Sequence, residues 1–174
     1  LSLSAHKFHG PKGIGVLYAK KSIELTTIME GGGQERGKRP GTENVPAIMG
    51  MAAALEEECG SMKEQAVKIT AMRDRLIQGL FRIPNSILNG SVRNRLPGNV
   101  SFCFEGVSGE SLLLLLDGKG ICASSGSACA SGALDPSHVL LALGRTPEAA
   151  QGSLRISLDS TNTEEEIDYM LEVI

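Results

Sequence analysis

The sequence has no excess of positive charge and no long apolar run. Its 17 Lys and Arg residues stand against 20 Asp and Glu, which gives a formal net charge of −3. A chain without an overall positive field is not expected to bind nucleic acid through its phosphates. The leucine run at 112–116 is far shorter than the roughly 20 residues of a membrane helix, and no signal-peptide pattern opens the chain. We therefore expect neither nucleic acid nor a membrane as a partner.

Cysteine is scarce, and the four residues form no metal-binding pattern. Cys59, Cys103, Cys122 and Cys129 include no CxxC pair and match no common zinc spacing, so we expect no metal site. Scattered thiols in a chain of this size fit a reducing compartment better than a disulfide framework, which predicts a cytoplasmic protein. The first three lie in apolar periodic segments and are predicted to be core residues.

The chain does have enough apolar content for a core. Its 174 residues are 41% hydrophobic, which is typical of a globular domain. It begins at Leu1, without an initiator Met and within a strand-like segment, so we expect it to be a fragment of a longer protein.

Hydrophobic periodicity and turn residues predict a mixture of helices and strands. Two strands are expected at 1–4 and 13–19, and the glycine-rich, charged stretch 31–42 is expected to be a loop. Two consecutive helices are predicted at 45–58, ended by Gly60, and at 61–81. Later segments predict strands at 86–88, 99–104, 121–123 and 153–158, and helices at 108–117, 136–143, 147–151 and from Thr163 to Val173.

Lys7 is a candidate nucleophile. It follows Ser4 and His6 where a strand runs into a Gly-Pro loop, a place where active-site groups often lie. A lysine amine whose pKa is lowered can form a Schiff base with a carbonyl substrate or with pyridoxal phosphate. The alternative is an ordinary solvated lysine beside a surface histidine.

Three further segments carry groups that could act on a ligand. The glycines at 31–33, with Gln34, Arg36 and Thr42, offer donors for a phosphate, although a plain flexible loop would look the same. Cys129 is surrounded by small residues, which predicts an exposed, mobile thiol or a linker with an incidental cysteine. Arg155 lies on the polar face of the strand at 153–158, where it could bind a carboxylate or simply face solvent.

Taken together, four segments in this order resemble one family. They are 4–15, 31–42, 124–129 and 154–168, and they are similar to the C-terminal half of cysteine desulfurases of the NifS/IscS type. That family belongs to the class-V aminotransferases, pyridoxal-phosphate enzymes of the aspartate-aminotransferase fold. Each segment alone is weak evidence for this family, but the four segments in this order are specific to it.

The resemblance implies a role for each candidate residue. Lys7 would form the Schiff base with pyridoxal 5′-phosphate, and Ser4 and His6 would bind its phosphate. Thr42 would reach the phosphate of the partner subunit in a homodimer. Arg155 would hold the carboxylate of L-cysteine, and Cys129 would accept the sulfur.

The reaction that the resemblance implies releases L-alanine and leaves a persulfide on Cys129. A sulfur acceptor, such as an iron–sulfur scaffold protein, would then receive the sulfur. The family's acidic partner for the pyridine nitrogen and its ring-stacking histidine have no counterpart in these 174 residues. We therefore expect this polypeptide alone not to turn over cysteine.

The implied fold is α/β, the C-terminal part of a pyridoxal-phosphate transferase. Residues 1–58 would end the large cofactor-binding domain, and 59–174 would form a small domain with a mostly antiparallel sheet. One alternative is a selenocysteine lyase or SufS-type desulfurase. The sequence Ser-Gly-Ser-Ala-Cys, which ends at Cys129, favours the NifS/IscS type instead. The other is a non-catalytic domain that docks sulfur acceptors, against which Lys7, Cys129 and Arg155 together argue.

Overall fold

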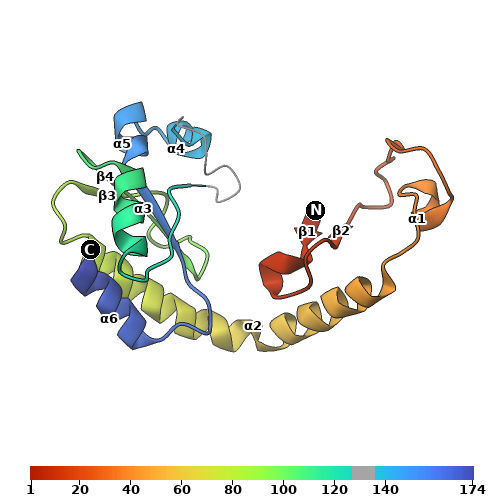
Figure 1. Ribbon diagram of the computed structural model, residues 1–174, viewed down its shortest axis with the longest axis horizontal. Coiled ribbons are helices and arrows are strands. Elements are labelled where there is room, and N and C mark those ends of the chain that lie inside the picture. The colour runs from red at the N-terminus through yellow and green to blue at the C-terminus, as the bar shows by residue number, and fades with distance from the viewer. Residues whose placement is uncertain (127–135) are drawn as a thin grey trace. The chain divides into compact units, whose positions relative to one another are not determined.

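The computed structural model describes residues 1–126 and 136–174, which fall into two compact units (Figure 1). The N-terminal unit is 1–62 and the C-terminal unit is 63–174. Helix α2, Val45–Leu80, contributes residues to both units. The boundary between the two units thus falls inside a helix. The assignment of 1–58 to a large domain and 59–174 to a small domain stays a prediction.

The N-terminal unit is built around a short antiparallel strand pair. Strand β1, Ser2–Ser4, runs into the 3-10 helix η1, Ala5–Phe8, and returns as β2, Gly15–Leu17. The two predicted strands are therefore confirmed. The stretch predicted to be a loop contains one four-residue turn, α1, Gln34–Gly37, in which three residues have positive φ and the backbone is not regularly helical.

Helix α2 is one continuous helix of 36 residues, so the prediction of two consecutive helices was wrong. Gly60 lies inside it, and the Ser61 hydroxyl donates to the Glu57 carbonyl one turn earlier (3.1 Å) rather than capping a new helix. A single glycine destabilises a helix by only about 1 kcal/mol, which the strong helix formers on both sides outweigh. In the described residues, no helix, α2 included, combines the length with the apolar composition needed to span a bilayer.

The C-terminal unit contains a three-stranded antiparallel sheet in the order β3-β4-β5. Its strands are β3, Ser86–Leu88; β4, Asn99–Phe104; and β5, Ser153–Ser157. The helices that follow α2 are α3, Gly109–Asp117; α4, His138–Ala142; α5, Pro147–Gln151; and α6, Glu164–Val173. The predicted α/β class and antiparallel sheet are confirmed.

One face of this sheet packs against helices and forms the main core. Val100, Phe102 and Leu154 are almost fully buried against the second half of α2 and against α6. Figure 1 shows α6 beside that half of α2, where Arg75 forms ion pairs with residues of α6. The Phe102 ring also meets the Phe81 ring edge to face at 5.3 Å. Alternation along β4 therefore places every second side chain in the core.

The opposite face of the sheet is only partly covered. Cys103 packs there against Leu140 of α4 and Ala150 of α5, and all three are buried. The remaining side chains of this face are largely polar, and they include Ser101 and Arg155. This polar face is where the candidate site of the C-terminal unit lies.

Two of the three cysteines predicted to be core residues are exposed. Cys103 is fully buried, as predicted, but Cys59 and Cys122 are exposed. Cys59 lies in the part of α2 before Met72, where no residue of the helix is buried. Cys122 belongs to 121–123, which is not a strand as predicted, because only Ser124 pairs with β5.

Candidate functional site

The turn at the end of β1 holds Lys7 and its neighbours on a fixed backbone. Ala5 is fully buried, its N–H donates to the Ile14 carbonyl (3.1 Å), and its carbonyl accepts the Gly10 N–H (2.9 Å). These bonds anchor the middle of the turn and leave His6 and Lys7 exposed. The sequence predicted this junction of strand and loop correctly.

The side chains presented by this turn suit pyridoxal phosphate. Within the described residues, Ser4, His6 and Lys7 make no side-chain hydrogen bond or ion pair. A hydroxyl and an imidazole can donate to a phosphate, and an amine can form a Schiff base with an aldehyde. The donor set therefore fits the cofactor that the family resemblance implies.

The glycine-rich stretch 31–42 is held in place by hydrogen bonds within it and to the residues just before it. The Gln34 side-chain oxygen accepts the Gly41 N–H (3.2 Å), and Lys38 donates to the Leu25 carbonyl (2.6 Å). Gln34 is thus engaged in shaping the loop. Thr42, the last residue of this stretch, is exposed and belongs to the same unit as Lys7.

Arg155 is a half-buried cation without a described partner. It lies in β5 directly opposite Ser101 of β4, and its backbone also pairs with Ser124 on the other side. Its Nε atom is buried and has no hydrogen-bond partner among the described residues. Because a buried guanidinium donor is unfavourable when unsatisfied, this position favours an anionic ligand.

Arg155 shares an open cavity with other polar residues of the C-terminal unit. Asn89, Arg95, Asn99 and Ser101 line the same cavity, which we call the polar basin. Burial and the nearby charge of Arg73 lower the pKa of Arg95 from its ordinary value. Arg95 stays a cation, since a guanidinium is not deprotonated in proteins.

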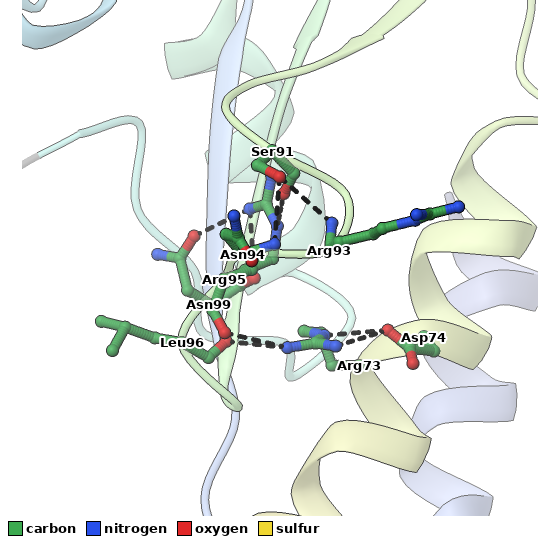
Figure 2. A network of polar contacts seen from close by, with 8 residues as sticks. All are labelled: Arg73, Asp74, Ser91, Arg93, Asn94, Arg95, Leu96 and Asn99. Atoms are coloured by element: carbon green, nitrogen blue, oxygen red, sulfur yellow. Dashed lines mark hydrogen bonds and ion pairs between the residues drawn. The ribbon is translucent and has the colours of Figure 1, made fainter.

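The donors of Arg95 are already used to hold the loop between β3 and β4. Its Nε donates to the Ser91 carbonyl (3.0 Å), one terminal nitrogen to the Asn99 side chain (3.0 Å), and the other to the Asn89 carbonyl. Figure 2 shows this network around Ser91 and Asn99. Arg95 therefore builds the wall of the polar basin, whereas Arg155 has donors left for a ligand.

A second arginine ties the same loop to α2. Arg73 is only 6% exposed, and it donates to the Leu96 carbonyl (3.1 Å) while pairing with Asp74 (2.8 Å) (Figure 2). Arg73, Arg95 and Asn89 were not among the residues predicted from the sequence. An arginine directly after Met72 on the buried face of a helix was the one available signal for Arg73.

The predicted site residues are distributed over both units. Ser4, His6, Lys7 and Thr42 belong to the N-terminal unit, and Arg155 belongs to the C-terminal unit. Cys129 lies outside the described residues. The roles assigned to these residues remain predictions.

Comparison with known proteins gives consistent matches along the whole chain. The model of the aminotransferase class-V family matches residues 1–170. The chain is 54% identical over 177 residues to "Cysteine desulfurase IscS" of Clostridium botulinum and 51% identical over 174 residues to the protein of that name from Methanosarcina thermophila. All of this chain is aligned in both cases, but it covers only 45% and 43% of those relatives.

Solved structures show the same relationship. A "NifS-like protein" superposes on 98% of this chain with a TM-score of 0.85 and 41% sequence identity, and the chain covers 43% of that protein. DndA from Streptomyces lividans superposes on 91% of the chain with a TM-score of 0.67 and 35% identity, and the chain covers 46% of it. The chain thus spans less than half the length of these relatives.

Proposed function

Because the chain belongs to the class-V aminotransferase family, we propose that it is part of a pyridoxal-phosphate-dependent cysteine desulfurase. The observation that carries the proposal is the 54% identity to a cysteine desulfurase along the entire chain. Further support comes from the Nε atom of Arg155 and the amine of Lys7, which have no hydrogen-bond partner among the described residues.

In this proposal, residues of the N-terminal unit bind the cofactor. Lys7 Nζ holds it covalently, and the Ser4 hydroxyl and the His6 ring donate to its phosphate. In a homodimer, Thr42 contacts the phosphate of the cofactor that is bound in the partner subunit. When bound, pyridoxal phosphate supplies an electron sink for the negative charge that develops at the substrate Cα.

The other residues act on the substrate. Arg155 binds the carboxylate of L-cysteine with its planar guanidinium, and Lys7 Nζ moves the Cα proton. The Cys129 thiolate attacks the substrate sulfur, so that the sulfur–Cβ bond breaks and a sulfur–sulfur bond forms. L-Alanine leaves, and the persulfide sulfur passes to an acceptor such as an iron–sulfur scaffold protein, in a cytoplasmic pathway.

The test uses the protein that carries this chain, incubated with pyridoxal phosphate. We expect borohydride reduction to fix the cofactor on the peptide containing Lys7, as read by mass spectrometry, and Lys7→Ala to abolish this label. Lys12→Ala changes an exposed lysine of the same turn and should keep it. A label that survives Lys7→Ala would contradict the assignment.

The sulfur step has its own test. Cys129→Ser should abolish release of alanine from cysteine while leaving cofactor attachment intact. Cys122→Ser removes an exposed thiol of the described residues and should retain the activity. If Cys129→Ser produces alanine at the rate of the unmodified protein, Cys129 is not the sulfur acceptor.

A further inference from the structure

Ser101 is the residue that lies directly opposite Arg155 in the sheet. Side chains of directly opposed residues in an antiparallel pair lie on the same face, with Cβ atoms about 4.5–5.5 Å apart. Both residues line the polar basin. The Ser101 and Arg155 side chains therefore start from adjacent positions on one face of the sheet and line the same cavity.

The chemistry of Arg145 fixes the orientation of the Asn89 side chain. Asn89 is only 4% exposed, and one atom of its amide lies 2.8 Å from Arg145 Nε. A guanidinium can only donate, so this atom of Asn89 is the oxygen. The Asn89 nitrogen then lies on the other side, where it donates to Ser101 Oγ (3.2 Å) and to Cys103 Sγ (3.3 Å).

This orientation decides what the Ser101 hydroxyl can do. Because its oxygen accepts from Asn89, its own proton must be donated elsewhere. No acceptor for that proton is found among the described residues. Ser101 therefore has a free donor at the polar basin, beside a cation that also has a free donor.

We propose that Ser101 is a second donor to the substrate carboxylate held by Arg155, and that Asn89 is a positioning residue that directs the Ser101 proton toward it. The inference rests on the proposed function, since it takes an amino-acid carboxylate as the ligand. Two oxygens of one carboxylate can accept from both residues, because an ionised carboxylate has about four acceptor sites.

The first test measures binding of L-alanine, which carries the carboxylate but no sulfur, to the cofactor-loaded protein that contains this chain. A hydrogen bond to a charged group contributes about 1.5–3 kcal/mol. Ser101→Ala should therefore lower the affinity for L-alanine by about tenfold or more. Ser101→Thr keeps the hydroxyl and should retain most of the affinity. Ser157→Ala, a matched change of an exposed serine in β5, should have no effect.

Cysteamine, which is cysteine without its carboxylate, serves as the second probe. Ser101→Ala should leave its binding unchanged, because the variant removes only a carboxylate contact. Equal weakening of L-alanine and cysteamine would indicate a general structural effect and would overturn the inference. Thermal unfolding of each variant, measured in parallel, reports any loss of the fold.

Asn89→Asp tests the positioning role. An aspartate still accepts from Arg145 but can only accept from Ser101, so it should turn the serine proton away from the polar basin. We expect a loss of L-alanine affinity similar to that of Ser101→Ala and no further loss in the double variant. Additive losses would mean that Asn89 acts independently of Ser101, which would contradict the proposal.

Arg155→Lys separates this inference from the proposed function. If Arg155→Lys weakens L-alanine and Ser101→Ala does not, the role of Ser101 is wrong and the proposed function stands. If Arg155→Lys has no effect either, the carboxylate does not bind at this position and the proposed role of Arg155 fails.

Discussion

Two arginines on α2, only two positions apart, have very different surroundings. Arg73 is buried and donates to backbone carbonyls of the loop between β3 and β4. Arg75 is about half exposed and forms ion pairs with Glu164 and Asp168. Exposed ion pairs contribute little to stability, whereas hydrogen bonds made by a buried charged group contribute more.

We therefore expect Arg73→Met to lower the free energy of unfolding by about 2 kcal/mol, because the hydrogen bonds from its charged guanidinium to the Arg95 and Leu96 carbonyls are lost. Arg75→Met is the matched control and should lower it by less than about 1 kcal/mol. Urea unfolding followed by circular dichroism suits this chain, which has no tryptophan. Equal effects of the two substitutions would show that the loop is not held through Arg73.

Sequence alone predicted the position of Arg155 better than that of Arg73. The period of two in 153–158 places Arg155 on the polar face of its strand, and the register with Ser101 confirms that face. The burial of Arg73 depends on a loop more than 20 residues later in the chain. The position directly after Met72 is the only local sign of this burial. The bonds of Arg95 go to residues at most six positions away, but they depend on the folded shape of an irregular loop, which no periodic pattern predicts.

At the scale of elements, α2 offers a direct test of its continuity. A Cβ added at Gly60 would meet no atom within 4 Å. We expect Gly60→Ala to raise the free energy of unfolding by about 0.5–1 kcal/mol, because alanine has the higher helix propensity. If Gly60 ended a helix, as the sequence suggested, the substitution would be destabilising instead.

Gly79 provides the control for Gly60 on the same helix. A Cβ at Gly79 would collide with the Leu171 side chain of α6. Gly79→Ala should therefore fail to stabilise the protein, although its gain in helix propensity is the same. Urea unfolding of both variants measures the difference.

Helix α6 begins with a capping box that the sequence predicted correctly. The Thr163 side chain accepts the Glu166 N–H, and the Glu166 carboxylate accepts the Thr163 N–H. Such a signal needs only four consecutive residues, so it can be read without knowing the fold. Strand 121–123 was mispredicted because its pairing depends on β5, which comes much later in the chain.

The capping box should make stability depend on pH. The pKa of Glu166 lies below its ordinary value of 4.5, because Asn162 and the Thr163 backbone donate to its carboxylate. A lowered pKa in the folded state gives stability that is present above the unfolded pKa and lost as the pH falls through the folded pKa. The ionised form is also favoured at a helix N-terminus.

We expect the melting temperature of Glu166→Gln to lie below that of the wild type near neutral pH and to converge with it as the pH falls from about 7 to about 3. Glu172→Gln, near the other end of α6, should follow the wild-type profile. A difference for Glu166→Gln that stays constant over this range would show that the carboxylate charge does not contribute.

At the scale of the whole molecule, burial is concentrated in one unit. Apart from Ala5 and Pro40, the buried residues of the described chain all lie in the C-terminal unit. Local unfolding is easiest where few apolar groups are buried, and an isolated strand pair is only marginally stable in water. The two units should therefore differ in local stability.

Amide hydrogen exchange measured by mass spectrometry should show this difference. We expect the slowest peptides to come from β4, β5 and residues 72–80 of α2, and peptides from 1–44 to exchange orders of magnitude faster. Slowest exchange within 1–44 would contradict the expected distribution of stability.

In strand β4, residues that stabilise the main core alternate with a residue that we propose binds the substrate. Val100 and Phe102 are buried in the main core, whereas Ser101 between them lies on the polar face with Arg155. A directed-evolution library could randomise positions 99 and 101 of this strand to alter ligand preference while leaving the thermal robustness of the fold largely untouched, because the buried Cys103 would be kept. A one-residue slippage of the strand would exchange the two roles and abolish both at once.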